Sequence, residues 1–303
     1  MNYLGYFGLR EAPFSLTPDT SFFFSHASHR EALNTLRVAL DSGEGFIRVS
    51  GEVGTGKTML CRMLLASFGE HEQAVYIPNP HLQPSMLRVA VARELDIGAE
   101  AIRDDAQLLS RIQERLIELA REGKRVVVCL DEAQAMPDGT LEALRLLTNL
   151  ETEKRKLLQV VLFGQPELEQ KLAKPELRQV RQRIAWSYRL QPYERRDVEA
   201  YVAHRLTVAG YDYDPLFSAR ALDALQRASG GVPRLINILA HKSMMLCYGR
   251  GDRRVHDGDV ATAAEDTDGA LPARRQSANW WLMASGVAAL LAGVWVLWTG
   301  PGL

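Results

Sequence analysis

The sequence predicts an α/β protein with a P-loop core and a parallel five-stranded sheet, followed by an all-α domain and a C-terminal transmembrane helix. Three observations lead to this prediction. Strand patterns alternate with helical patterns as far as about residue 191, which is typical of a parallel sheet covered by helices on both faces. Only helical patterns follow as far as residue 266, and residues 280–299 are almost wholly apolar.

The composition is that of an ordinary globular protein of 303 residues, with 24% charged and 47% hydrophobic residues. The net charge of −1 argues against a protein that coats DNA without specificity, because such proteins usually carry a basic surface. Cys61, Cys129 and Cys247 are far apart and form no CxxC motif, so we expect free thiols in a reducing compartment.

The N-terminal stretch "MNYLGYFGLREAPFSL" lacks the basic start of a signal peptide, and two charged residues interrupt its apolar run. We therefore expect the N-terminal domain to remain in the cytoplasm. The first helix is predicted within residues 25–43, where Ser28 and Glu31 form the pattern of a capping box. His26 and His29 are interpreted as part of this helix start, since no cluster with metal-ligand spacing surrounds them.

The motif "GEVGTGKT" follows a predicted strand, "GFIRVS", and precedes a predicted helix, which is the context a P-loop requires. Its backbone N–H groups and the helix N-terminus can hold the phosphates of ATP. Lys57 is expected to reach the β- and γ-phosphates, and Thr58 to bind Mg²⁺. The expected nucleotide-binding residues are Gly51, Glu52, Val53, Gly54, Thr55, Gly56, Lys57, Thr58 and Met59.

The second half of the site is predicted in "RVVVCLDEAQ", residues 125–134. An apolar run of this kind indicates a buried parallel strand, which would deliver the two acids to its carboxyl edge. Asp131 is expected to hold Mg²⁺ through water, and Glu132 to polarise the attacking water as a general base. Both roles belong to ATP hydrolysis.

The other strands and helices follow from the same patterns. Further strands are expected at residues 74–80, 157–165 and 186–192, with core helices at 58–68, 84–95, 104–123, 140–151 and 175–184. After Pro192 the pattern is purely helical, with helices expected at 195–210, 218–231, 232–249 and 257–266. We expect these last four to form a second domain.

The C-terminal segment predicts a membrane helix. Nineteen residues from Trp280 to Trp298 include only one polar residue, and a helix of that length spans about 28 Å, close to the thickness of a bilayer core. Tryptophans mark both ends, as in an aromatic belt, and Arg274 and Arg275 lie on the N-terminal side. This places the N-terminal domain in the cytoplasm and residues 299–303 outside. A buried core helix is the alternative.

The sequence thus predicts five parts of the chain. They are a lead-in with the first helix (1–42), the α/β nucleotide-binding domain (43–191), a helical lid domain (192–266), a linker (267–279) and the transmembrane helix (280–299).

An α/β P-loop core, an Asp-Glu pair and a helical lid resemble the AAA+ ATPases. The blocks "YFGLREAPFSLTPD", "VCLDEAQAMP", "LRQVRQRI" and "SGGVPRLINILAHKSM" are similar to a narrower group, the general secretion pathway A-type ATPases. Within that group the similarity is greatest to the ATPases of mannose-sensitive haemagglutinin (MSHA) type IV pilus biogenesis. The resemblance runs from about residue 1 to residue 266.

This resemblance implies further roles in the site. Gln165 falls at the position of the sensor-1 residue of AAA+ proteins, although glutamine is not the commonest choice there. Arg234 matches the sensor-2 arginine of the lid, which reads the γ-phosphate. Phe14 is expected near the adenine, together with Pro13.

The resemblance also implies an arginine finger that reaches the ATP of a neighbouring subunit. Within "LRQVRQRI" we favour Arg183, with Arg178 and Arg181 as alternatives; the basic run could also be a solvated helix face. A finger supplied by a neighbour requires a ring or partial ring, so we expect the chain to assemble with itself into an oligomer of about six subunits.

These observations lead to one expected function and two alternatives. We expect an Mg²⁺-dependent ATPase, anchored in the bacterial inner membrane by one helix, that acts with pilus or secretion assembly proteins. One alternative is an ATP-dependent DNA-binding regulator of transposition or replication, although the near-neutral charge and the absence of an appended DNA-binding motif make nucleic acid an unexpected partner. The other is a scaffold that binds ATP without turnover.

Overall fold

The computed structural model describes residues 3–17, 19–98, 105–150 and 156–271. Its core is a five-stranded sheet in the order β2-β3-β4-β1-β5, with every neighbouring pair parallel. The predicted parallel five-stranded sheet is therefore confirmed. The strands are β1 (Phe46–Ser50), β2 (Glu72–Ile77), β3 (Arg125–Leu130), β4 (Leu158–Gly164) and β5 (Ile184–Arg189).

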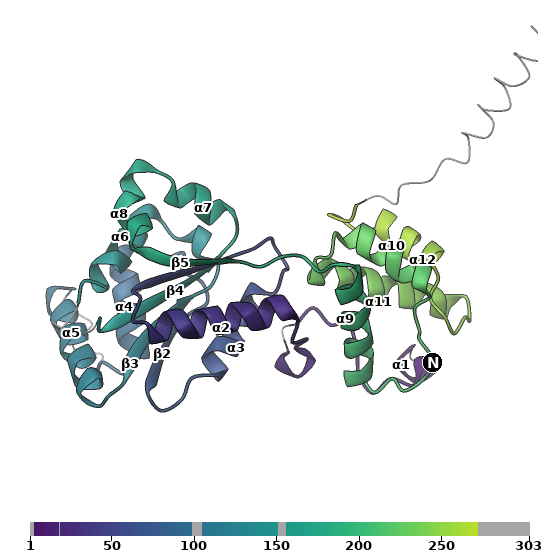
Figure 1. Cartoon of the computed structure of the whole chain (residues 1–303), viewed down its shortest axis with the longest axis horizontal. Helices are drawn as coiled ribbons and strands as arrows, with labels where there is room; N and C mark the ends of the chain where they lie inside the picture. Colours follow the sequence, from purple (N-terminus) through teal and green to yellow (C-terminus); the bar gives the residue numbers. More distant parts are fainter. Residues whose placement is uncertain (1–2, 18, 99–104, 151–155, 272–303) are drawn as a thin grey trace, which may run out of the picture.

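Helices cover both faces of this sheet (Figure 1). The two that pack on one face are α2 (Ala27–Asp41) and α3 (Lys57–Ala66). Those that pack on the other face are α4 (Pro84–Glu94), α5 (Asp105–Arg121), α6 (Asp138–Leu147), α7 (Glu167–Leu172) and α8 (Arg178–Arg183). Because both faces are covered, the central strands β3 and β4 are mainly apolar.

Strand β3 shows how the sequence produces this layering. Successive side chains of a strand point to opposite faces, so Val126 and Val128 join the core under α4–α6. Val127 and Cys129 join the core under α2 and α3. All four side chains are at most 1% exposed. An apolar run without alternation is thus what a strand covered on both faces requires.

A group of helices follows β5 and forms a third hydrophobic core, separate from the two on the sheet. These helices are α9 (Arg195–Val208), α10 (Ala219–Ser229), α11 (Pro233–Gly249) and α12 (Asp257–Glu265). They are referred to below as the lid helices. In Figure 1 they stand beside the carboxyl end of the sheet, with β5 leading to them.

The N-terminal segment packs against the lid helices, which the sequence did not predict. It begins with α1 (Tyr3–Phe7), and its residues Phe7, Phe14 and Phe22 are buried in the same core as α9–α12. The Arg10 N–H donates to the Ala209 carbonyl at the end of α9, at 2.8 Å. The chain therefore starts in the lid and then crosses to the sheet through α2.

Several element boundaries differ from the expected ones. The first helix begins at Ala27, and His26 is its N-cap, with Nδ1 accepting from the Ser28 N–H. The expected capping role of Ser28 was therefore wrong. The helix expected over 175–184 is divided into a 3-10 turn, Pro175–Leu177, and α8. Helices α1 and α7 are too short to show a clear periodicity in the sequence.

The three cysteines are free, as expected, and all three are buried. No helix within the described residues has the length and hydrophobicity needed to cross a membrane. The predicted transmembrane helix, residues 280–299, and most of the predicted linker before it lie outside the described residues.

A close backbone contact joins the connection after β5 to the start of α11. The Tyr193 N–H donates to the Gly231 carbonyl at 2.8 Å, and Gly231 has a φ of +76°. A Cβ atom at this position would collide with the Tyr193 backbone. Only glycine fits this conformation and this space without strain.

We predict that Gly231→Ala lowers the free energy of unfolding by on the order of 2 kcal/mol, because it adds a steric clash to an unfavourable φ. Urea unfolding followed by circular dichroism measures the change. Gly258→Ala is the matched control, since a Cβ there meets no atom within 4 Å and lies inside α12. It should leave stability unchanged or raise it by up to about 1 kcal/mol. Equal stability of the two variants would contradict this role of Gly231.

Candidate functional site

The P-loop connects β1 to α3 at the carboxyl edge of the sheet. Gly54 and Gly56 adopt φ values of +82° and +97°, so the loop turns in a way that residues with a side chain rarely allow. Gly56 is also the N-cap of α3 and, as a glycine, provides no side-chain cap for the first N–H groups of that helix. These donors, together with the helix dipole, form the anion-binding end that phosphates require.

Lys57 is the first residue of α3 and is only 4% exposed. Its Nζ donates to the Gly51 carbonyl at 2.7 Å and to the Glu52 carbonyl at 2.9 Å, so the amine lies inside the loop. Burial lowers the pKa of Lys57, and the negative charges of Glu132 and Asp131 oppose this effect. The side chain is thus a buried cation that faces two carboxylates.

Asp131 directly follows β3 and is 3% exposed. Burial raises its pKa, while hydrogen bonds from the Thr58 side chain and the Glu132 N–H act in the opposite direction. The structure therefore brings Thr58 and Asp131, the two expected Mg²⁺ residues, into direct contact. A hydroxyl and a carboxylate are oxygen donors of the type that Mg²⁺ prefers, so these residues fit the ion.

Glu132 is held in an uncommon backbone conformation beside this pair. Its φ is +53°, one of two positive values at non-glycine residues in the described chain. Its Oε2 accepts from Gln134 Nε2 at 2.5 Å and from Gln165 Nε2 at 3.0 Å. Gln165 directly follows β4, so the expected sensor-1 residue contacts the expected general base.

The sheet register explains why these residues meet. Ser50 of β1 pairs with Gly164 of β4, and β4 also pairs with β3. Because all strands are parallel, the residues that follow β1, β3 and β4 emerge at one edge. Gln165 lies between the P-loop and the Asp131–Glu132 pair for this reason.

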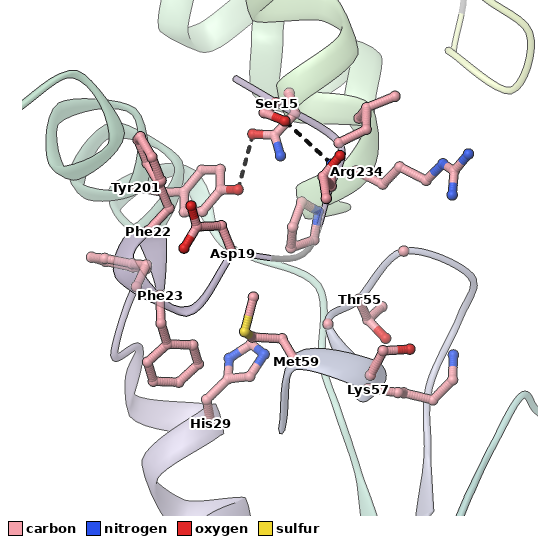
Figure 2. Close-up of a pocket in the computed structure, with 18 of the residues that line it drawn as sticks. Ser15, Asp19, Phe22, Phe23, His29, Thr55, Lys57, Met59, Tyr201 and Arg234 are labelled. Atoms are coloured by element: carbon pink, nitrogen blue, oxygen red, sulfur yellow. Dashed lines mark hydrogen bonds between the residues drawn. The ribbon is translucent and has the colours of Figure 1, made fainter. Parts of the chain in front are cut away.

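A pocket lies between this edge and the lid helices (Figure 2). Nine of the residues expected in the site line it, and they are Val53, Gly54, Thr55, Gly56, Lys57, Thr58, Met59, Glu132 and Arg234. Gly51, Glu52, Asp131, Gln165, Arg183 and Phe14 do not line it. The first four of these lie directly behind the lining through the bonds described above.

The N-terminus of α11 forms the part of the pocket wall that comes from the lid helices. The Arg234 N–H donates to the Gly54 carbonyl at 3.2 Å. A Cβ placed on Gly54 would lie 2.5 Å from the Arg234 Cβ, so the two backbones are nearly in contact. The Arg234 side chain is exposed and runs along the P-loop. The structure thus places the expected sensor-2 arginine at the phosphate end of the pocket.

The other end of the pocket is aromatic and includes residues that the sequence did not identify. Figure 2 shows Phe22 and Phe23 on one side and His29 and Met59 below, with Asp19 reaching toward the centre. The remaining lining residues are Ser15, Leu16, Thr17, Phe24, Tyr193, Tyr201, Arg205, Pro233 and Asn237. The only sequence signal for this wall was the aromatic run at positions 22–24.

Phe14, which was expected near the adenine, lies elsewhere. Its ring is 3% exposed and packs edge-to-face against Phe217 in the lid core, with centroids 6.1 Å apart. Pro13 does not line the pocket either, and its carbonyl accepts a hydrogen bond from Arg205 Nε at 2.5 Å. Phe22, Phe23 and Phe24, which begin eight positions further along the chain, line the pocket instead.

The three candidate finger arginines lie away from this pocket. Arg183 ends α8 at the amino end of β5, where Ile184 pairs with Phe46 at the start of β1. The P-loop begins at the other end of β1, roughly 15 Å away for a strand of five residues. Arg178 and Arg181 are exposed on α8, and Arg183 is half-buried.

Known proteins are similar to this chain in sequence or in fold. A family model described as an AAA domain matches residues 39–172. General secretion pathway protein A of Aeromonas hydrophila is 42% identical over 298 residues, which are 98% of this chain and 53% of that protein. The chain therefore spans about half the length of this relative.

Two solved structures show the same P-loop AAA fold. Cdc6p of Pyrobaculum aerophilum has a TM-score of 0.63 at 20% identity, covering 82% of this chain and 70% of that one. The ORC2 protein of Aeropyrum pernix, in its ADPNP–ADP complexes, has a TM-score of 0.60 at 16% identity. That comparison covers 84% of this chain and 72% of the other.

The His29 ring packs against the P-loop, and burial favours its neutral form. Its ring is 3% exposed and hydrogen-bonds to the backbone of Thr55, and its Nε2 would lie 2.8 Å from a Cβ on Gly56. Nδ1 is buried and has no partner within the described residues. Burial, aided by the nearby His26, lowers the pKa of His29 from 6.5 to about 4.

We predict that this burial makes the protein acid-sensitive. Because the pKa is lower in the folded state, the stabilisation is present above pH 6.5 and is lost as pH falls toward 4. Between pH 7.5 and pH 5 the loss from His29 should be on the order of 2 kcal/mol. Urea unfolding of the native protein and of His29→Gln at both pH values measures it. The variant should lose less stability on acidification, and an equal loss in both proteins would contradict the prediction.

Proposed function

We propose that this chain, which contains an AAA domain and is similar to general secretion pathway protein A along nearly its whole length, hydrolyses ATP to assist assembly of a secretion apparatus or a type IV pilus. One observation carries the enzymatic part of this proposal. Lys57, the Thr58–Asp131 pair and Glu132 meet at one sheet edge, under a pocket whose far end is aromatic. Such an arrangement suits a triphosphate that carries a nucleobase.

The phosphates would bind to the loop N–H groups and to Lys57. In the structure Lys57 donates to two neutral carbonyls, and phosphate oxygens are stronger acceptors because they are charged. The Arg234 side chain, lying against Gly54, would add a second cation from the lid. Binding of ATP would therefore connect the core to the lid through opposite charges.

Mg²⁺, held by Thr58 and, through water, by Asp131, would neutralise charge on the β- and γ-phosphates. Glu132 would accept a hydrogen bond from the attacking water and polarise it toward the γ-phosphorus. Gln165, which bonds to Glu132, would act as sensor 1 by donating to the same region. Each of these residues can be tested by a single substitution.

The position of Arg183 supports a role in a neighbouring subunit. Its own P-loop lies at the opposite end of β1, so it is remote from the ATP of its own chain. We propose that it acts as the finger in an oligomer of about six subunits, where its charge would stabilise the transferring phosphoryl group. Arg178 and Arg181 remain candidates because they are exposed on the same helix.

We further propose that the ATPase is held at the bacterial inner membrane by residues 280–299, with the lid domain (192–266) and linker (267–279) between the core and the bilayer. The apolar, tryptophan-flanked sequence of this segment supports a membrane helix. The anchor would keep the nucleotide-binding domain on the cytoplasmic side, next to its protein partners. Among these partners we favour assembly proteins of a secretion system or an MSHA-like pilus.

We predict that Glu132→Gln lowers kcat for ATP by about 10²-fold or more while the Kd for ATP changes little, because the amide cannot act as a base. Phosphate release and titration with a fluorescent ATP analogue measure the two quantities. Glu114→Gln, an exposed residue on α5, is the control and should retain full activity. Undiminished hydrolysis by Glu132→Gln would remove Glu132 from the mechanism.

We predict that Arg183→Ala lowers kcat by about 10³-fold but still binds ATP, because the finger acts on the transition state of a neighbour. Hydrolysis by the native protein should also rise more steeply than linearly with protein concentration. Arg111→Ala, an exposed site on α5, is the control. Parallel Arg178→Ala and Arg181→Ala variants identify the finger, and full activity of an isolated monomer would exclude any finger in trans.

A further inference from the structure

Gln134 bridges two parts of the site that the proposed mechanism treats separately. Its Nε2 donates to Glu132 Oε2 at 2.5 Å, and its Oε1 accepts from the Gln165 backbone N–H at 3.0 Å. Gln165 in turn donates to the same Glu132 oxygen. The three residues form a closed network that joins the end of β3 to the end of β4.

This network determines which way the Gln134 amide faces. A backbone N–H is always a donor, so the atom that bonds to Gln165 N must be the amide oxygen. The NH₂ group then necessarily faces the Glu132 carboxylate, for which it is a suitable partner. Gln134 therefore presents a donor of fixed orientation to Glu132 without adding charge.

The backbone around Gln134 is also held in place. Lys171 of α7 donates from Nζ to the carbonyls of Gln134 and Met136, at 2.6 and 2.5 Å. The short 3-10 turn Ala133–Ala135 follows Glu132 directly, and Gln134 is half-buried in it. Because both its backbone and its amide oxygen are anchored, the donor cannot easily follow a moving Glu132.

We propose that Gln134 is a positioning residue that orients the Glu132 carboxylate for ATP hydrolysis. This inference rests on the proposed function of Glu132. Oε2 is held by the two amides, which leaves Oε1 as the oxygen that would accept from the attacking water. Without Gln134, the nearby positive charge of Lys57 and the negative charge of Asp131 would still act on Glu132, but no fixed donor would hold its carboxylate from the β3 side.

The test is Gln134→Met in the full-length chain, because methionine keeps the length of the side chain and removes both hydrogen bonds. We expect kcat to fall by about 10- to 100-fold, because a misplaced catalytic group lowers the rate by about this factor. The Kd of a fluorescent ATP analogue should stay within about twofold, and KM should change little. Gln113→Met, on the exposed face of α5, is the matched control and should behave like the native protein.

A double-mutant cycle separates positioning from a merely structural role. If Gln134 acts through Glu132, adding Gln134→Met to Glu132→Gln should produce no further fall in single-turnover hydrolysis. The same fold-reduction in both backgrounds, a parallel loss of ATP affinity, or full activity of Gln134→Met would each overturn the inference. If instead Glu132→Gln alone hydrolyses ATP at the native rate, the proposed role of Glu132 fails, and this outcome is distinct from the others.

Discussion

The whole site depends on one constraint, the parallel insertion of β4 between β1 and β3. This pairing directs the residues after all three strands to one edge of the sheet, although they are up to about 110 positions apart in the sequence. It brings a buried cation, Lys57, toward two carboxylates and places Gln165 between them. If β4 were on the outside of the sheet, the P-loop and the Asp131–Glu132 pair would be neighbours without a residue to connect them.

Burial affects the charged groups of the site, Lys57 and Asp131, by changing their pKa values. Lys57 and Asp131 are both nearly inaccessible, and for each the burial shifts the pKa toward the neutral form. For Lys57 the charges of Glu132 and Asp131 oppose that shift. For Asp131 the hydrogen bonds from the Thr58 side chain and the Glu132 N–H oppose it, with a smaller effect from Lys57. Removing Lys57 or Asp131 would take one of these compensating charges away from a buried partner, which would destabilise the site. Each buried charge therefore depends on several neighbours in the site.

The lid and the N-terminal segment form one body that closes the pocket from the side opposite the sheet. The aromatic wall comes from residues 22–24, and the phosphate end from the start of α11, so two segments far apart in the chain share one hydrophobic core. The contact between the Arg234 N–H and the Gly54 carbonyl joins this body to the P-loop. A rotation of the lid would shift Arg234 and with it the P-loop backbone at Gly54. The nucleotide bound at the P-loop could therefore affect the orientation of the lid through this contact.

The sequence alone determined the strands and their burial on both faces, the P-loop, the acidic pair after β3 and the change to an all-helical domain. These features are local, because each depends on the periodicity or spacing of neighbouring residues. Only the tertiary structure decided that the aromatic run 22–24 rather than Phe14 faces the pocket, that the N-terminus packs into the lid, and that Gln165 meets Glu132 and Gln134. Such contacts join segments distant in sequence, and they depend on how the sheet and the lid core pack, which no local pattern of residues encodes.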